Sequence, residues 1–428
     1  METLVDMMST VIDFLRPFGL RSGLLRGLWA PALPFVAVLG LAACETDRAV
    51  PMDAAEPWHT EPEYRIGGLV DGNATFERVT GQRVGSGGTR VYVLDPGLER
   101  LTVWSPEGAQ LLEVGWAGEE EGELDSPDHI ELRDEGFQLR DGNSFVLFAD
   151  DGQHRQTVSL PAAVGFNRFR LRPELMLPDG AFVVSLRIPN GVRAGWFGED
   201  PVEEAPVLRL EPVEDRWELD SLAVLDIGNR DLDIRPGESD FGWSLHTAQP
   251  FGNADHLDLR AGSSTLLVTR ENPADPGLVE LSEISAAGDT VWSARLRFEP
   301  LPLLPADVDA ALEAEARAVS GTVGSLPLDE AVALVREALY VPDYHPAVMD
   351  TEVMSNGQLW IRNHEEPGDT LDVWYTVRLG GENAAPRRIL VPWSFYPFDA
   401  TDTHVWGIRL DPEAGQQVVG RRLVRAGD

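Results

Sequence analysis

Two short segments of the chain repeat an acidic residue followed by histidine, ahead of alternating apolar and acidic positions. They are Asp128-His129-Ile-Glu-Leu-Arg133 and Asp255-His256-Leu-Asp-Leu-Arg260. Carboxylates and neutral imidazoles bind divalent cations, with Zn²⁺ accepting both groups and Ca²⁺ preferring oxygen. Asp128, His129, Asp255 and His256 are therefore the candidate metal ligands, and Ca²⁺ or Zn²⁺ is the candidate cofactor.

The two pairs do not by themselves complete a catalytic metal site, which typically uses three protein ligands. Spacing does not select the third ligand among four candidates: His404, Asp350, Asp399 and Asp402. The alternative is structural, because an aspartate ahead of a strand also satisfies backbone groups of the preceding loop. Both interpretations stay open, and no catalytic residue is identified.

Composition excludes several other kinds of site. All 35 basic residues are arginine, so Walker-type phosphate loops and Schiff-base chemistry, which need lysine, are excluded. A single cysteine excludes intramolecular disulfides and cysteine-rich zinc or iron–sulfur sites. The formal charge of −36 repels phosphate backbones, so we expect no nucleic-acid partner.

Short alternating strands between tight turns must position the candidate residues. The clearest run is Arg90–Asp95, Arg100–Trp104 and Gln110–Val114, with Pro-Gly and Pro-Glu-Gly turns between the strands. Asp-Gly and Asn-Gly precede further apolar trios along the chain, and these dipeptides favour hairpin turns because glycine adopts positive φ. The pattern indicates consecutive β-meanders.

Irregularly repeated four-stranded meanders predict an all-β fold, a six-bladed β-propeller over residues 63–428. The last unit is short of strands, and we expect 64–70 and 74–79 to complete it and close the ring. The alternatives are five or seven blades, or a two-sheet sandwich. The six units are expected near 81–114, 126–160, 168–226, 253–297, 346–391 and 395–424. Both Asp-His pairs then begin innermost strands, at the wall of the central channel.

The run from Val91 to Gly115 resembles an NHL-type propeller repeat. The C-terminal third, including Asn356-Gly-Gln-Leu-Trp-Ile-Arg362 and Leu371-Asp-Val-Trp374, is similar to six-bladed propeller lipoproteins of environmental bacteria. These resemblances imply a fold and a location and import no activity. Some propeller enzymes with NHL-like or lactonase-like folds hold metals in the channel, which supports the metal interpretation of the Asp-His pairs.

Residues 305–340 break the strand pattern. Apolar residues recur at helical spacing over 305–320 and again over 327–340, and Pro327 suits the first turn of a helix. We expect a helical hairpin inserted between two blades. Its apolar stripe packs on the propeller, either to cover a blade edge or to form a lid or partner-binding element.

The first residues resemble a bacterial lipoprotein leader. Arginines precede an uncharged apolar stretch at 27–43, and Leu41-Ala42-Ala43-Cys44 resembles a lipobox. The resemblance implies that residues 1–43 are a signal peptide and that Cys44 is lipidated. Residues 44–62, which are polar and proline-containing, are then expected to be a flexible tether. An uncleaved membrane anchor is disfavoured by Pro31 and Pro34, which interrupt the short apolar stretch.

These features predict a membrane-tethered propeller facing the periplasm or the cell exterior, which acts as a ligand- or protein-binding or scaffold module. Its partner is not identified by the sequence, although the negative charge favours a cationic one. The alternative is a metal-dependent hydrolase or lyase with its site in the channel, and a purely structural envelope role is the third hypothesis.

Replacing the lipidation site tests the expected anchor. Cys44→Ser should move the protein from the membrane fraction to the soluble fraction, because no thiol remains to receive acyl chains. The measurement is cell fractionation followed by immunoblotting. A variant that still partitions with membranes would contradict lipidation at Cys44.

Overall fold

The computed structural model describes residues 49–70, 73–116, 118, 120–160, 170–187, 202–213, 216–234, 245–259, 265–323, 326–364, 370–380, 385–411 and 415–427. These residues belong to one compact unit, Thr46–Asp428. The expected signal peptide at 1–43, the lipobox residues Leu41, Ala42 and Ala43, and Cys44 lie outside the described residues.

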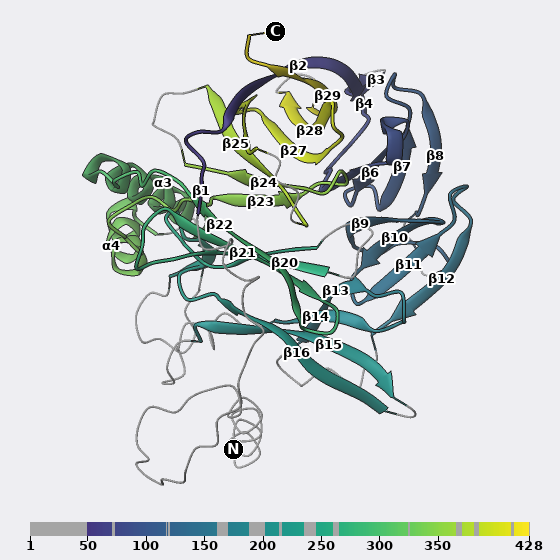
Figure 1. Ribbon diagram of the computed structural model, residues 1–428, viewed down its shortest axis with the longest axis horizontal. Coiled ribbons are helices and arrows are strands. Elements are labelled where there is room, and N and C mark those ends of the chain that lie inside the picture. The colour runs from purple at the N-terminus through teal and green to yellow at the C-terminus, as the bar shows by residue number, and fades with distance from the viewer. Residues whose placement is uncertain are drawn as a thin grey trace, which may run out of the picture. The chain divides into compact units, whose positions relative to one another are not determined.

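Antiparallel meanders follow one another along the first half of this unit (Figure 1). The first contains β5 (Gly81–Val84), β6 (Val91–Asp95), β7 (Arg100–Trp104) and β8 (Gln110–Val114). The second contains β9 (Pro127–Arg133), β10 (Gly136–Asp141), β11 (Ser144–Phe148) and β12 (His154–Ser159). The third contains β13 (Arg170–Met176), β14 (Phe182–Arg187), β15 (Glu204–Val213) and β16 (Arg216–Asp226).

The fourth sheet gains a strand from the N-terminal segment. Its meander contains β19 (His256–Leu259), β20 (Thr265–Glu271), β21 (Leu278–Ser285) and β22 (Thr290–Arg297). On its outer edge β1 (Val50–Pro51) pairs parallel to β22. Separate short hairpins pair β3 (Leu69–Val70) with β4 (Asn73–Ala74) and β17 (Asp231–Ile234) with β18 (Leu245–Ala248).

The remaining strands form one eight-stranded sheet in the order β23-β24-β25-β26-β2-β29-β28-β27. One half contains β23 (Asp350–Val353), β24 (Gln358–Arg362), β25 (Leu371–Arg378) and β26 (Arg387–Pro392). The other contains β27 (Phe395–Ala400), β28 (His404–Asp411), β29 (Gly415–Arg425) and β2 (Glu56–Gly67). The halves join where β2 pairs parallel to β26, while its other edge pairs antiparallel to β29.

The fold is all-β and propeller-like, with sheets arranged around a common centre (Figure 1). The prediction of six separate blades differs from the sheets observed in the described residues. Four sheets stand alone as meanders of the ring, whereas the last two predicted units share the eight-stranded sheet. The cause is the pairing of β2 with β26, which no local sequence pattern indicates.

The expected tether over 44–62 also differs from the structure, from Val50 onward. Residues of this segment form β1 and most of β2, and the Met52 side chain is fully buried. The prolines that suggested a flexible tether instead lie in strands that pair with neighbours. As expected, residues of 64–70 complete the last unit, because β2 pairs with β29 through Gly67. The other segment expected there, 74–79, does not join that unit, because Ala74 lies in β4, which pairs with β3, and residues 75–79 form no strand.

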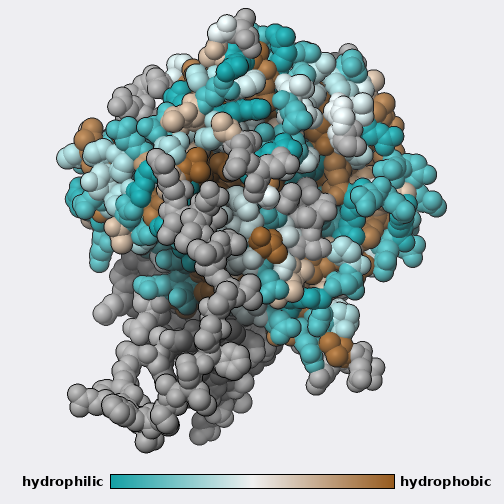
Figure 2. All heavy atoms as spheres, viewed as in Figure 1, coloured by the Kyte–Doolittle hydropathy of each residue, from teal (hydrophilic) through white to brown (hydrophobic). Residues whose placement is uncertain are grey.

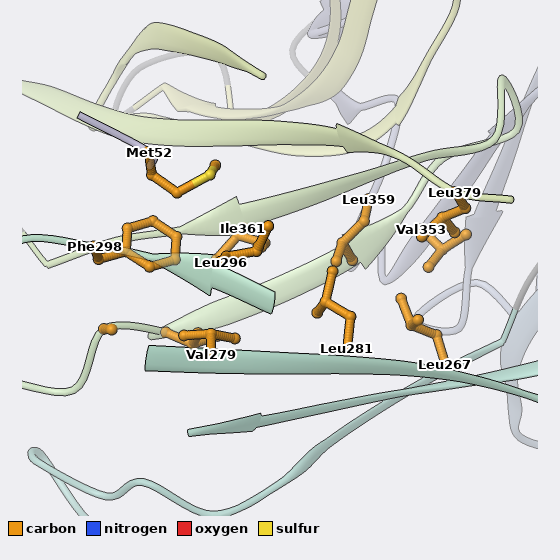
Figure 3. Packing of buried hydrophobic residues seen from close by; sticks show 12 residues of the cluster. Met52, Leu267, Val279, Leu281, Leu296, Phe298, Val353, Leu359, Ile361 and Leu379 are labelled. Atoms are coloured by element: carbon orange, nitrogen blue, oxygen red, sulfur yellow. The ribbon is translucent and has the colours of Figure 1, made fainter. Parts of the chain in front are cut away.

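The visible surface and the interior differ sharply in character. In Figure 2 hydrophilic residues predominate on the viewed face, and hydrophobic residues form small separate groups. Inside, Figure 3 shows apolar side chains of the fourth sheet meeting those of the eight-stranded sheet. Met52 packs into this cluster beside Leu296 and Phe298. Large aromatic residues fill other sheet contacts, and Trp360, Trp374 and Trp406 are all buried.

The predicted helical hairpin is present as α3 (Pro305–Val323) and α4 (Leu328–Ala338). Its apolar stripe, including Ala316 and Val335, packs against Leu232 and Ile234 of β17. The hairpin therefore covers the short β17–β18 sheet. None of the helices in the described ranges is long and apolar enough to cross a membrane.

Truncating Met52 tests whether the N-terminal segment is part of the folded core. Met52→Ala should lower the free energy of unfolding by about 2–5 kcal/mol, because it leaves a cavity among packed side chains. Asp53→Ala, at the exposed neighbouring position, is the matched control and should change it by less than about 0.5 kcal/mol. Urea denaturation followed by tryptophan fluorescence gives both values. Equal, small effects would contradict the packing of this segment.

Candidate functional site

A hollow of about 260 Å³ lies where the innermost strands converge. Its wall draws mainly on β5, β9, β13, β19, β23 and β27, each of them the inner strand of its meander, together with Arg140 of β10. The lining combines three arginines, four carboxylic acids and one histidine, and it is therefore strongly polar. They are Arg83, Arg140, Arg172, Asp128, Glu174, Asp258, Glu352 and His129.

Arg83, on β5, is a buried arginine whose hydrogen bonds go to backbone oxygens and not to carboxylates. The residue is 8% exposed. Its Nη1 donates hydrogen bonds to the backbone oxygens of Gln82, at 3.0 Å, and Phe398, at 3.2 Å. The Nε atom is buried and lacks a hydrogen-bond partner among the described residues.

Carboxylic acids from β19 and β23 face the same hollow. Asp258 accepts a hydrogen bond from the Thr351 hydroxyl at 2.7 Å, and burial raises the pKa of Asp258 to about 6. Burial also raises the pKa of Glu352 to about 8, although the charge of Arg83 opposes that shift. Glu352 is therefore mostly protonated at pH 7, while Asp258 is mostly ionised.

Tyr396 on β27 connects to this group of acids. Its hydroxyl donates to Asp350 Oδ2 at 2.5 Å and lies 3.4 Å from Glu352 Oε1. Burial, followed by the charges of Glu352 and Asp350, raises the pKa of Tyr396 far above its ordinary value. The phenol therefore stays protonated and acts as a hydrogen-bond donor.

The first predicted pair, Asp128 and His129, lines the hollow, but its carboxylate is held by arginines. Arg140 Nε lies 2.6 Å from Asp128 Oδ1, and Arg172 Nη2 lies 3.0 Å from Asp128 Oδ2. Burial, and then the charges of Arg83, Arg140 and Arg172, lower the pKa of His129 well below its ordinary value. His129 is therefore a neutral imidazole at pH 7.

The second predicted pair has a different environment. Asp255 is 2% exposed, and its Oδ2 lies 2.5 Å from Arg270 Nη2 and accepts the Asp226 backbone N–H at 2.8 Å. Burial lowers the pKa of His256. Asp255 thus fills the backbone-satisfying role that was the structural alternative for these pairs.

The four residues considered as third metal ligands are separately engaged. His404 contacts Glu63, at 3.2 Å, Asp350 accepts from Tyr396, and Asp402 lies 3.8 Å from Arg378. Asp399 is fully buried and accepts the backbone N–H groups of Val84 and Ser355. Within the part of the chain that the structure describes, no three His, Cys, Asp or Glu side chains are grouped so that they could hold a metal ion.

A larger groove of about 870 Å³ lies at one end of the inner strands. Loops that follow β5, β9, β23 and β27 converge there, because these inner strands end on the same face. They contribute mainly glycines and neutral polar residues, including Gly85, Gly88, Ser355, Asn356, Thr401 and Thr403. Tyr64, at the edge, stacks on Trp406 with ring centroids 5.5 Å apart.

Sequence reasoning did not select Arg83, Asp258 or Glu352. Asp258 is the fourth residue of the second Asp-His segment. The repeat therefore does mark a residue of the hollow, but at its fourth position and not at the Asp-His pair. Arg83 follows Gln82 in a short strand, where nothing distinguishes it from a surface arginine. Asp128 and Asp255 differ from these residues because their carboxylates form ion pairs with arginines on the adjacent strands, β10 and β20.

Comparisons with known proteins give no family assignment. No protein-family model matches the chain, and the search of curated proteins found no match. Similar solved structures include a putative exported protein from Bacteroides fragilis, with 10% identity, 87% of this chain and 99% of that chain covered, and a TM-score of 0.39. Others are the calcium-binding protein regucalcin from Agrobacterium tumefaciens (10% identity, 87% and 97% covered, TM-score 0.36) and streptogramin B lyase (10% identity, 84% and 97% covered, TM-score 0.35). Similarity at this level assigns no activity.

The buried acid on β23 predicts a pH dependence of stability. Glu352 ionises near pH 4.5 when unfolded and near pH 8 when folded, so the folded state binds more protons between these values. The free energy of unfolding should therefore fall as pH rises across this window. Glu352→Gln, which stays neutral, should flatten the fall, whereas Glu337→Gln at an exposed position of α4 should not. Urea midpoints from pH 5 to 8.5 measure the slopes, and identical slopes in all three proteins would contradict the assignment.

Proposed function

We propose that this protein is a membrane-tethered binding module of the bacterial cell envelope, and that a polar ligand binds in the groove at one end of its channel. The observation that carries the proposal is the groove of about 870 Å³, which four separate loops build together. Its volume lies within the range of about 300–1,000 Å³ typical of ligand sites.

The architecture supports this proposal when the eight-stranded sheet is counted as two blades. Each half is a four-stranded meander, and with the four separate meanders they supply the six inner strands that line the hollow. We therefore interpret the fold as a six-bladed, NHL-like propeller. Loops on a rigid ring of this kind are suited to binding, because the scaffold holds them in place.

The lining of the groove favours a polar ligand. Hydroxyl and amide groups of Ser355, Asn356, Thr401 and Thr403 supply neutral donors and acceptors, while Arg133 and Asp134 supply opposite charges at one side. The glycine-containing loop at 85–88 lets a ligand approach the backbone closely. A ligand with several hydrogen-bonding groups matches this surface better than an apolar one.

The leader and the net charge support the location and the choice of partner. Lipidation at Cys44 would hold the protein at a membrane, with the propeller in the periplasm or at the cell exterior. A formal charge of −36 attracts cationic partners and repels nucleic acid. The hypothesis of a metal-dependent hydrolase or lyase has less support, because arginines occupy the carboxylates of Asp128 and Asp255.

Filling the groove tests the proposal. Asp402 is exposed at the groove and Asp309 is exposed on α3, so Asp402→Trp should fill the groove and Asp309→Trp should not. The purified wild-type protein and both variants are dialysed against a soluble envelope extract, and enriched compounds are quantified by mass spectrometry. We expect a compound that wild type and Asp309→Trp enrich and that Asp402→Trp enriches at least tenfold less.

The proposal is wrong if the three proteins enrich the same compounds to the same degree, or if none enriches any. Circular dichroism and thermal midpoints of the variants establish that a loss of enrichment does not come from unfolding.

A further inference from the structure

The arginines that line the hollow differ in how their charges are compensated. Arg140 pairs with Asp128 and Glu174, each at 2.6 Å, and Arg172 pairs with Asp128 at 3.0 Å. Arg83 is as deeply buried as Arg140, yet no carboxylate lies within 4.0 Å of its guanidinium in the described part of the chain. Its hydrogen bonds go to two backbone carbonyls, and its Nε makes none.

A buried cation without a paired anion is energetically costly, because the charge loses its hydration. The guanidinium group is planar and presents its N–H donors in a fork that matches a carboxylate. Arg83 lines the hollow, so an anionic group of a bound molecule would supply the partner that the protein does not. The unpaired buried arginine therefore indicates a ligand with a carboxylate.

A ligand with only a negative charge would not suit this hollow. Asp258 and Glu352 line the same space, and Asp350 lies beside them on β23. A simple anion would be repelled by the ionised carboxylate of Asp258, while a simple cation would be repelled by Arg83. A molecule that carries both charges can place its carboxylate at Arg83 and its ammonium group at the acids.

We propose that the channel hollow is a binding site for a small zwitterion, an amino acid or a related amino carboxylate, with Arg83 binding the carboxylate and Asp258 and Glu352 binding the ammonium group. The hollow of about 260 Å³ has room for roughly nine water molecules, which suits a molecule of this size. This site is separate from the groove, and it is expected whether or not the groove binds a ligand.

Calorimetric titration of the full-length protein in detergent tests this site at pH 7. The probes are the twenty standard amino acids and the amino carboxylates from β-alanine to 6-aminohexanoate. Each zwitterion that binds is compared with the two analogues that lack one of its charged groups, the carboxylic acid and the amine. We expect at least one zwitterion to bind, and at least tenfold more tightly than either analogue.

Two variants separate the charges. Arg83→Gln should weaken binding of the zwitterion at least tenfold and strengthen binding of the amine analogue. Asp258→Asn should weaken the zwitterion and strengthen the carboxylic acid analogue. Such opposite changes would not follow from a general loss of structure, and Asp258→Asn keeps the test decisive if Arg83→Gln does not fold. Arg317→Gln, which removes an exposed arginine from α3, is the control and should leave every affinity unchanged.

The inference is overturned if no zwitterion of the panel binds. It is also overturned if single-charge analogues bind as tightly as the zwitterion, or if Arg83→Gln and Asp258→Asn leave its affinity unchanged. Asp402→Trp changes the groove and not this hollow. Failure of the groove proposal and failure of the zwitterion site can therefore be told apart.

Discussion

The ring depends on the two-sided pairing of β2, which comes from the N-terminal part of the described chain and lies between two strands from its C-terminal part. One edge of β2 pairs with β29 from Trp58 to Gly67, and its other edge pairs with β26 from Glu56 to His59. Without β2, both partner strands would expose unpaired backbone groups, and exposed edges promote aggregation. The pairing also brings β27 and β5 together, and these inner strands supply Phe398 and Arg83 to the hollow.

The polar channel follows from this convergence of inner strands. Each inner strand directs some residues into a contact between neighbouring sheets and others toward the axis. The apolar residues of β19, Leu257 and Leu259, pack in a core cluster, while Asp258 between them interacts with Thr351 of β23. Since the axis receives side chains from every meander at once, opposite charges accumulate there, and most but not all of them pair within the protein.

The sequence was a good guide to local structure because strand alternation, glycine turns and helical spacing are local properties. It predicted the meanders, α3 and α4, and the completion of the last unit by residues from Tyr64 to Gly67, but it wrongly added 74–79 to that unit. It did not predict the strands within 44–62, because prolines resemble a linker until their pairing partners are known. It selected Asp128 and Asp255 as ligands because their partners, Arg140 and Arg270, lie on the neighbouring strands and are revealed only by strand register.

The same limit applies to Arg83, whose importance comes from a partner that the protein does not provide. A crystal structure of the protein purified without denaturation from its native source would examine this directly. We expect a small molecule between the Arg83 guanidinium and the Asp258 carboxylate, with the carboxylate of that molecule on Arg83. Direct pairing of Arg83 with Asp258 or Glu352, in a hollow that holds only water, would contradict it.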